Sequence, residues 1–153
     1  MKIIIADDLK DSKELFELYS EWVTEKVSPK TQKITFEEYK KQLNKSTTFI
    51  AKEEGKIVGF LMCRMKKSNE TTIMYKLKKG ETYANIDSIY IAPKYRNKGI
   101  GAALVNSCKE ELKKHGKYKI IVLADSTNPS ELINFYEKNG FKTLFVSMIN
   151  EDF

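Results

Sequence analysis

Residues 83–105 read YANIDSIYIAPKYRNKGIGAALV, and three patterns follow one another in this stretch. Its first part, up to Ile91, is rich in β-branched and aromatic residues and predicts a strand that ends before Pro93. A basic, glycine-containing loop follows at residues 96–101, and apolar residues then recur at helical spacing from Ile100 onward. The first N–H groups of a helix have no partner within the helix and favour negative charge. The stretch therefore predicts an anion-binding cradle, with phosphate as the expected anion.

The length and composition are those of one ordinary globular domain. The chain has 153 residues, 41% hydrophobic and 31% charged, which predicts a single domain over residues 1–153 with a core of its own. No apolar run approaches the roughly 20 residues of a membrane helix. The apolar start at residues 3–5 is cut short by Asp7 and Asp8, so it predicts a first strand rather than a signal peptide. We expect no membrane partner.

The cysteines and the histidine are too few and too scattered for a metal site. Cys63, Cys108 and the single His115 show no metal-ligand spacing, so we expect no metal. Unpaired cysteines of this kind suit a reducing compartment, which predicts a cytoplasmic protein.

The net charge of +6 is concentrated in one segment. Residues 94–119 hold eight basic and two acidic residues, which equals the whole excess of the chain. Lysines of this segment that fall on the predicted helix are explained by a solvated helix face. Arg96 and Lys98, beside the glycines, better fit a field that attracts a polyanion.

Strands and helices are mixed along the chain. The predicted strands are Lys2–Ala6, Thr47–Lys52, Lys56–Arg64, one near Thr71–Leu77, the strand that ends at Ile91, Lys119–Ala124 (continuously apolar, hence expected to be buried on both faces) and Phe141–Ile149. The predicted helices run from Asp11 or Ser12 to Lys26, from Thr35, from about Lys98 to His115, and from Asn128 (Ncap, with Pro129 at N1 and Glu131 at N3) to Gly140. This order predicts an α/β (mixed α+β) domain with a mixed sheet.

Two motifs in this order resemble a known family. Tyr-Arg-x-x-Gly-x-Gly at residues 95–101 opens a helix, and a later helix that starts at Asn128 ends in Phe-Tyr-Glu-Lys-Asn-Gly-Phe at residues 135–141. The combination resembles the GNAT (Gcn5-related) N-acetyltransferases, over roughly residues 84–141. Residues 86–91, followed by Tyr-Arg, look closest to the small-molecule and polyamine branch.

The resemblance implies both a fold and an acyl donor. The implied fold is a central, mostly antiparallel sheet flanked by about four helices, in which two parallel strands, Ala84–Ile91 and Lys119–Ala124, splay apart around acetyl-CoA. The pyrophosphate would lie on the N–H groups of residues 97–102, and the pantetheine arm would pair with the backbone of residues 89–91. The residues that the resemblance assigns to acetyl-CoA are Ile89, Tyr90, Ile91, Arg96, Asn97, Lys98, Gly99, Ile100, Gly101, Ala102, Asn128 and Tyr136.

Acetyl transfer to an amine also requires groups that move protons. A free alkylamine has a pKa near ~10.4, so a base must make it neutral before it attacks. By resemblance, Tyr136 is the general acid, and the Ile91 N–H binds the oxyanion. Asp87 is the candidate base, acting through a water because it is shorter than the glutamate of similar enzymes. Asn85 stands where the histone-acetylating branch has its glutamate, and an amide cannot act as a base.

Each of these residues also has a plain structural interpretation. Tyr136 is typical of a core tyrosine, and Asp87 of an acid that binds loop amides or faces solvent. Asn128 could only cap its helix, since eight residues separate it from Tyr136 where the family usually has seven.

Other functions remain open at this point. A dinucleotide-binding unit is favoured by Gly99-x-Gly101 and Asp125, but Leu104 replaces the third glycine and Pro93 separates strand from loop. A basic nucleic-acid binder lacks a stacking motif, so we expect no nucleic-acid partner. A catalytically weak acyl-CoA-binding sensor and a protein or peptide amine acetyltransferase are the remaining alternatives.

The acceptor amine is the least determined part of the prediction. We expect a small amine (a polyamine, an aminoglycoside-like amine or an amino acid) or a protein amine, in a pocket shaped by residues 22–35, Tyr83 and the last strand. The acids that could attract a cationic amine are Glu81, Glu151 and Asp152. An edge strand at Phe141–Ile149 could pair between chains and form a homodimer.

Overall fold

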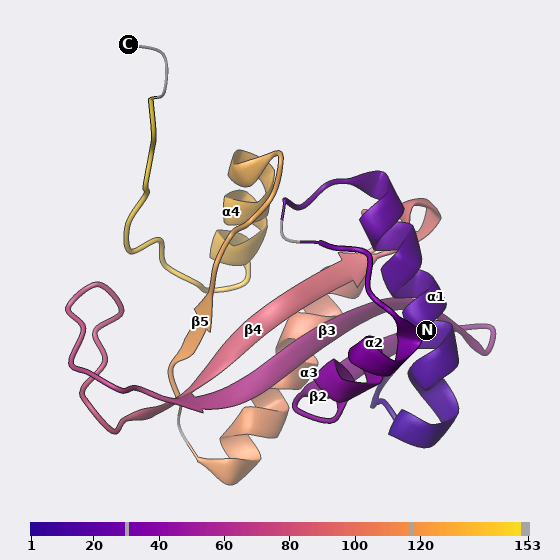
Figure 1. Ribbon diagram of the computed structural model, residues 1–153, viewed down its shortest axis with the longest axis horizontal. Helices are drawn as coiled ribbons and strands as arrows, with labels where there is room; N and C mark the ends of the chain where they lie inside the picture. Colours follow the sequence, from indigo (N-terminus) through magenta and orange to yellow (C-terminus); the bar gives the residue numbers. More distant parts are fainter. Residues whose placement is uncertain (30, 117, 151–153) are drawn as a thin grey trace.

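The fold is a five-stranded mixed sheet with helices on both faces, seen in a computed structural model that describes residues 1–29, 31–116 and 118–150 (Figure 1). The strands are β1 (Lys2–Ile5), β2 (Thr47–Glu53), β3 (Lys56–Lys67), β4 (Thr82–Ile91) and β5 (Ile120–Val122). They lie side by side in chain order; the first four are antiparallel, and β5 is parallel to β4. The predicted fold class is confirmed.

Two hydrophobic cores lie on the two faces of the sheet. The described α-helices are α1 (Asp8–Glu25), α2 (Phe36–Leu43), α3 (Ile100–His115) and α4 (Pro129–Lys138). On one face, α1 and α2 bury Leu15 and Tyr39 against the sheet. On the other, α3 buries Leu104 and α4 buries Tyr136 (Figure 1). No helix in the described ranges has an apolar stretch long enough to cross a membrane.

Local sequence explains where several elements begin. Thr35 accepts the Glu38 N–H, and the Glu38 carboxylate accepts the Thr35 N–H, which forms a capping box at the start of α2. Residues 54 and 55, both with positive φ, make the tight turn between β2 and β3 that Glu-Gly predicts. In α3, three of the residues with predicted helical spacing, Ile100, Leu104 and Cys108, are buried, and the fourth, Leu112, is partly buried against the same core.

A bulge in β4 changes the face of the sheet to which the following side chains point. The β3–β4 register shifts between Met62, opposite Ser88, and Cys63, opposite Ile86, which leaves Asp87 as the extra residue. Strand side chains alternate between faces, yet Ile86 and Ile89, three apart, both pack in the α3 core. The shift in phase therefore places Asp87 and Ser88 together on the opposite face.

β4 and β5 splay apart after a short contact. They pair only over Ala84–Ile86 and Ile120–Val122, and Figure 1 shows β5 turning away toward α4 beyond this point. The Ala92 N–H donates to the Val58 carbonyl at 2.9 Å, on the β3 side. Because alternate residues of a strand direct their backbone groups to the same side, the N–H groups of Ile89 and Ile91 point away from β3, into the gap.

Three predicted strands differ from the structure. Residues 141–150 form no strand; they run away from the sheet beside α4 (Figure 1). Strand propensity takes effect only against a partner, and here Phe145 packs edge-on against Tyr75, with ring centroids 5.5 Å apart. Residues 71–77 form a turn closed by one bridge between Thr72 and Leu77.

The third difference is β5 itself, which is shorter and less buried than predicted. Its three residues are half-buried rather than enclosed on both faces, because within the described residues no strand covers its outer edge. The edge that was predicted to pair between chains, residues 141–149, is likewise absent. In α1, the helix begins at Asp8, so Asp11 and Ser12 lie inside it instead of capping it.

Candidate active site

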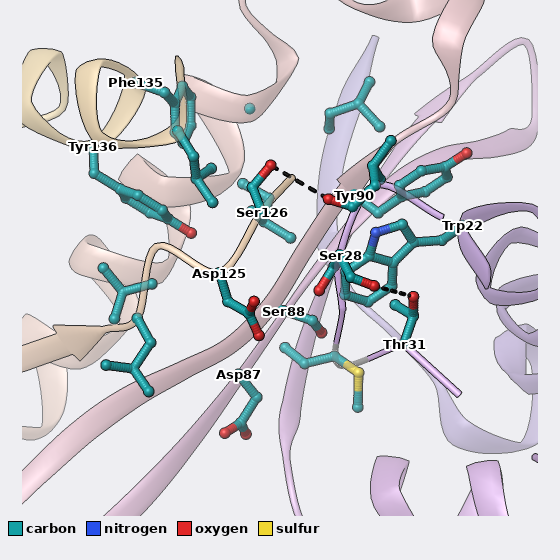
Figure 2. A pocket seen from close by; sticks show the side chains of 18 of the residues that line it. Trp22, Ser28, Thr31, Asp87, Ser88, Tyr90, Asp125, Ser126, Phe135 and Tyr136 are labelled. Carbon is teal, nitrogen blue, oxygen red and sulfur yellow. Dashed lines mark hydrogen bonds between the residues drawn. The ribbon is translucent and has the colours of Figure 1, made fainter. Parts of the chain in front are cut away.

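A cavity of about 820 Å³ lies where β4 and β5 splay apart (Figure 2). Its lining comes from α1 and the segment after it, from β3 and β4, from the loop before α3, and from β5 through α4. The predicted site residues that line it are Asp87, Ile89, Tyr90, Ile91, Arg96, Asn97, Gly101, Asn128 and Tyr136. The other predicted residues, Lys98, Gly99, Ile100 and Ala102, belong to the adjoining loop and helix start.

The loop before α3 has the shape of an anion cradle. Asn97 (φ 59°) and Gly99 (φ 78°) both have left-handed backbone conformations, which turn successive N–H groups toward a common concavity. A Cβ at Gly99 would meet no atom within 4 Å, so the concavity is open. At Gly101 a Cβ would come within 3.0 Å of Phe135, so this glycine lets α3 and α4 approach closely. These residues fit a pyrophosphate.

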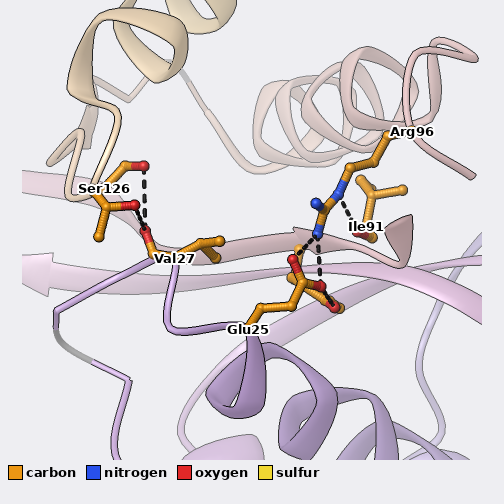
Figure 3. A network of polar contacts seen from close by, with 7 residues as sticks. Glu25, Val27, Ile91, Arg96 and Ser126 are labelled. Atoms are coloured by element: carbon orange, nitrogen blue, oxygen red, sulfur yellow. Dashed lines mark hydrogen bonds and ion pairs between the residues drawn. The ribbon is translucent and has the colours of Figure 1, made fainter. Parts of the chain in front are cut away.

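Arg96 does not point into the cradle in this structure (Figure 3). Its Nε donates to the Ile91 carbonyl at 2.9 Å, and one terminal nitrogen donates to both carboxylate oxygens of Glu25, each at 2.9 Å. The guanidinium also lies 5.4 Å from the centre of the Tyr90 ring. Arg96 therefore connects the end of α1 to the end of β4.

Tyr90 completes this connection. Its hydroxyl donates to Glu25, and its ring stacks on Trp22 at 5.9 Å between centroids. Burial, together with the Glu25 carboxylate, raises the pKa of Tyr90, so the hydroxyl remains a donor.

The segment after α1 also bridges the gap to the chain after β5. The Val27 carbonyl accepts the Thr127 N–H at 2.9 Å and the hydroxyls of Ser126 and Thr127 at 3.3 Å each (Figure 3). These bonds join two walls of the cavity that lie far apart in sequence.

Tyr136 projects its hydroxyl into the cavity from α4 (Figure 2). The residue is 5% exposed, and its ring packs edge-on against Phe135 and Phe141, at 5.1 and 5.2 Å between centroids. Within the described residues the hydroxyl has no hydrogen-bond partner, and burial raises the pKa of Tyr136. Tyr136 is thus both a core residue and a proton-bearing group that faces the cavity.

Asp87 is held more firmly than a free base would be. Arg64 donates to both of its oxygens, from Nε to Oδ2 and from a terminal nitrogen to Oδ1 at 2.8 Å. The Asn85 amide donates to Oδ1 at 2.7 Å. Three N–H groups therefore occupy the two oxygens of this carboxylate.

A second carboxylate faces the same space. Asp125 follows β5, and Figure 2 shows its carboxylate directed across the gap toward Ser88. The sequence did point to Asp125, but only as support for a dinucleotide-binding unit. A polar residue just past the carboxyl end of a strand is the signal that could have placed it in this site. Arg64 and Glu25 were missed because their partners lie 23 and 71 residues away.

The remaining predicted residues have other surroundings. Asn128 is the N-cap residue of α4, as predicted, but its side chain donates to the Glu131 carboxylate at 3.0 Å and makes no hydrogen bond to the helix backbone. Glu81 pairs with Lys119 at 2.8 Å. Glu151 and Asp152 lie outside the described residues. In the described part of the chain, no group of three His, Cys, Asp or Glu side chains is placed to hold a metal.

A mixed sheet that splays over an anion cradle defines the class of acyltransferases that the sequence resembles. The acetyltransferase (GNAT) family profile matches residues 12–141, and the chain belongs to this family. The predicted family is therefore confirmed.

Named relatives agree with this assignment. An uncharacterized N-acetyltransferase of Methanocaldococcus jannaschii is 33% identical over 94 residues, which is 61% of this chain and 38% of that protein. An N-alpha-acetyltransferase of Sulfurisphaera tokodaii is 32% identical over 100 residues, 64% of this chain and 58% of that protein. The matched region thus spans between about two fifths and three fifths of these relatives.

Solved structures share the fold over nearly the whole chain. A predicted acetyltransferase from Clostridium acetobutylicum, crystallised with acetyl-CoA, has a TM-score of 0.71 and 22% identity, and the match covers 97% of this chain and 95% of that one. At this identity the likeness supports the fold.

Proposed function

We propose that this protein is an N-acetyltransferase that moves an acetyl group from acetyl-CoA to a primary amine by direct attack in a ternary complex. The observation that carries the proposal is the arrangement of the cavity, which has an anion cradle at the loop before α3 and the Tyr136 hydroxyl directed inward from α4. Family membership supports acetyl-CoA as the donor.

The residues that would hold acetyl-CoA lie along one wall. The N–H groups of residues 97–102 suit its pyrophosphate, and the backbone groups of Ile89 and Ile91 suit a strand-like partner such as the pantetheine arm. Asn128, at the start of α4, lines the same cavity. Bound there, acetyl-CoA supplies the acetyl group as a thioester.

Two groups of this chain would assist the transfer from the donor side. Tyr136 keeps its proton at neutral pH because burial raises its pKa, and it would donate that proton to the departing sulfur as the C–S bond breaks. The Ile91 N–H, directed into the gap, would hydrogen-bond the carbonyl oxygen as negative charge develops on it.

The amine must lose a proton as the N–C bond forms, and Asp87 and Asp125 are the carboxylates placed to receive it. Asp87 is the base that the resemblance implies, but Arg64 and Asn85 occupy its oxygens. We assign proton acceptance to Asp125 because its carboxylate is directed across the cavity toward Ser88, and we assign Asp87 to the positioning of Arg64.

Asn substitutions separate the two assignments. Asp125→Asn is expected to lower kcat at least about tenfold. Asp87→Asn is expected to change mainly the KM of the amine. A kcat loss confined to Asp87→Asn would restore Asp87 as the base.

The function itself is tested with a panel of amines, by following thiol release from acetyl-CoA. The panel includes polyamines, amino sugars, amino acids and peptides with a free N-terminus, because one relative is named an N-alpha-acetyltransferase. We expect turnover of a small amine. Preferred turnover of peptides would favour protein acetylation, and acetyl-CoA binding by calorimetry without any turnover would favour a sensor.

A further inference from the structure

The geometry points to an anion-binding subsite, formed by Arg64 and Lys66 of β3, at the end of the cavity away from the cradle. It would select amines that also carry a phosphate or a carboxylate. This inference rests on the proposed acetyl transfer and names the class of acceptor.

Alternation along β3 brings the two cations to one wall. Arg64 and Lys66 are half-buried and line the cavity, whereas Met65 and Lys67 between and beyond them are exposed and do not. Since strand side chains alternate between faces, the pair projects to the side of the sheet where Met62 also lines the cavity.

Arg64 is fixed in orientation by Asp87. Two of the five N–H groups that a guanidinium carries are taken by the Asp87 carboxylate, which Asn85 holds in turn. In the described part of the chain, no other acceptor binds Arg64. Its remaining N–H groups are therefore available to an oxyanion, and the side chain is already ordered for it.

Lys66 adds a positive charge that Asp87 does not balance. Among the described residues no carboxylate lies within ion-pair distance of Lys66, whereas Lys52 and Lys119 each pair with an acid at 2.8 Å. Arg64, Lys66 and Asp87 together carry one net positive charge. A half-buried charge in a cleft attracts a counter-ion more strongly than the same charge on open surface.

The cavity lining also includes polar residues at the end of α2. Gln42, near the end of α2, and Ser46, just after it, also line the cavity. The Gln42 amide can donate to an oxyanion alongside the two cations, whereas the Ser46 hydroxyl donates to the Gln42 carbonyl at 2.9 Å. This end of the cavity is therefore chemically suited to bind a phosphate or carboxylate.

This subsite is too far from the cradle to serve the same phosphates. Arg64 lies opposite Asn85, six residues from Ile91, or about 20 Å along an extended strand. From Ser88, which lies across the gap from the proposed base Asp125, the row of Arg64 is about 10 Å away and that of Lys66 about 15 Å. The span suits an amine and an anion several bonds apart, as in an amino-sugar phosphate or an ω-amino acid, rather than an α-amino acid.

The test compares acceptor pairs that differ only in the anion. The phosphate arm uses glucosamine 6-phosphate and glucosamine, and the carboxylate arm uses 6-aminohexanoate and hexylamine. We expect at least one anionic member to have a kcat/KM about tenfold or more above its uncharged partner, as charge-assisted hydrogen bonds would give. The arm that shows the preference identifies the anion, and no preference in either arm overturns the subsite.

Lys66→Met and Lys67→Met form a matched pair of variants. Lys66→Met should raise the KM of the preferred anionic acceptor about tenfold and leave kcat and the uncharged acceptor unchanged. Lys67→Met should leave all of these unchanged. An equal effect of both variants would mean that only the overall charge matters, which also overturns the subsite.

Calorimetry separates this inference from the proposed function. If no amine is turned over, glucosamine 6-phosphate and 6-aminohexanoate are titrated into the wild type and into Lys66→Met, each with CoA present. Weaker binding by the variant would support the subsite although acetyl transfer had failed. Equal binding, or none to the wild type, would overturn it.

Discussion

The two walls of the cavity are built in different ways. The wall assigned to acetyl-CoA comes largely from one continuous segment, residues 89–102, and its shape follows from local backbone conformation at Asn97 and Gly99. The opposite wall is assembled from the end of α1, from β3 and from the chain after β5. Its contacts join residues as far apart as Val27 and Thr127.

This difference predicts how each wall responds to change. In a wall built from one continuous segment, a substitution should impair only the part of the wall that contains it. The assembled wall depends on long-range polar contacts, and Arg96 joins it to the cradle loop through Glu25. Changes in that network should affect the acceptor even when they lie outside the cavity.

The largest expected effect is at Tyr136, whose hydroxyl faces the cavity and is proposed to donate a proton to the departing sulfur. Tyr136→Phe keeps the buried ring but removes the proton donor, so kcat should fall at least about tenfold with little change in either KM. Because burial raises the pKa of Tyr136, wild-type kcat should show no loss from its ionisation up to about pH 10, the ordinary tyrosine value. Steady-state kinetics between pH 6 and about pH 10 measure both the kcat of the variant and the pH dependence of wild-type kcat.

Tyr118→Phe is the matched control. The Tyr118 hydroxyl donates to the His115 carbonyl at 3.0 Å, at the end of α3, and does not line the cavity. Its removal should leave kcat unchanged. Unchanged turnover in Tyr136→Phe would exclude that residue as the general acid.

The locally built wall is tested at Gly101. In Gly101→Ala the new methyl group would come within 3.0 Å of the Phe135 ring, so this ring must move away by a few tenths of an ångström. We expect acetyl-CoA to bind roughly tenfold more weakly, a loss of about 1.4 kcal/mol, with the KM of the amine unchanged. Calorimetry measures the affinity for acetyl-CoA, and steady-state kinetics at saturating acetyl-CoA measure the KM of the amine.

Gly80→Ala provides the comparison for this variant. Gly80 has φ +81° and open space around it, in a turn that does not line the cavity. Gly80→Ala should lower the stability of the fold without weakening the binding of acetyl-CoA. If both variants weakened acetyl-CoA binding equally, the affinity would depend on the stability of the fold rather than on the local shape at Gly101.

The assembled wall is tested at Glu25. Glu25→Gln removes the charge that Arg96 pairs with and weakens the acceptor of the Tyr90 hydroxyl. Loss of these charge-assisted bonds should cost about 1–2 kcal/mol of stability and raise the KM of the amine several-fold. Denaturant unfolding and amine kinetics are the measurements, with the exposed Glu17→Gln of the same helix as control. An unchanged KM would mean that the network only stabilises the fold.

The same contrast explains what the sequence could predict. The cradle loop, α3 and the start of α2 at Thr35 depend on residues within a few positions of one another, and all were predicted from local patterns. The clamp of Arg64 on Asp87 depends on the register of two strands and on a bulge, which no local pattern contains. Residues 141–149 have strand-forming composition, but composition cannot supply the partner strand that a sheet requires.

The smallest expected effect is in the capping box of α2, the helix whose other end contributes Gln42 to the cavity lining. Thr35→Ala removes the side chain that accepts the Glu38 N–H, which should lower Tm by about 2–4 °C. The backbone and side-chain hydrogen bonds of Thr35 hold the pKa of Glu38 below its ordinary value. A lowered folded-state pKa contributes stability above the unfolded pKa, and this is lost as pH falls through the folded value. The Tm difference should therefore narrow below about pH 4.

Thr24→Ala tests whether this effect belongs to the cap. The Thr24 hydroxyl donates to the Ser20 carbonyl within α1, where alanine is the better helix former, so this variant should keep or raise Tm. Neither variant should change kcat, because neither threonine lines the cavity. A raised amine KM in Thr35→Ala alone would show that α2 must be fixed at its first turn for Gln42 and Ser46, at its other end, to be in place. The assembled wall would then extend to a helix start that has no contact with the acceptor.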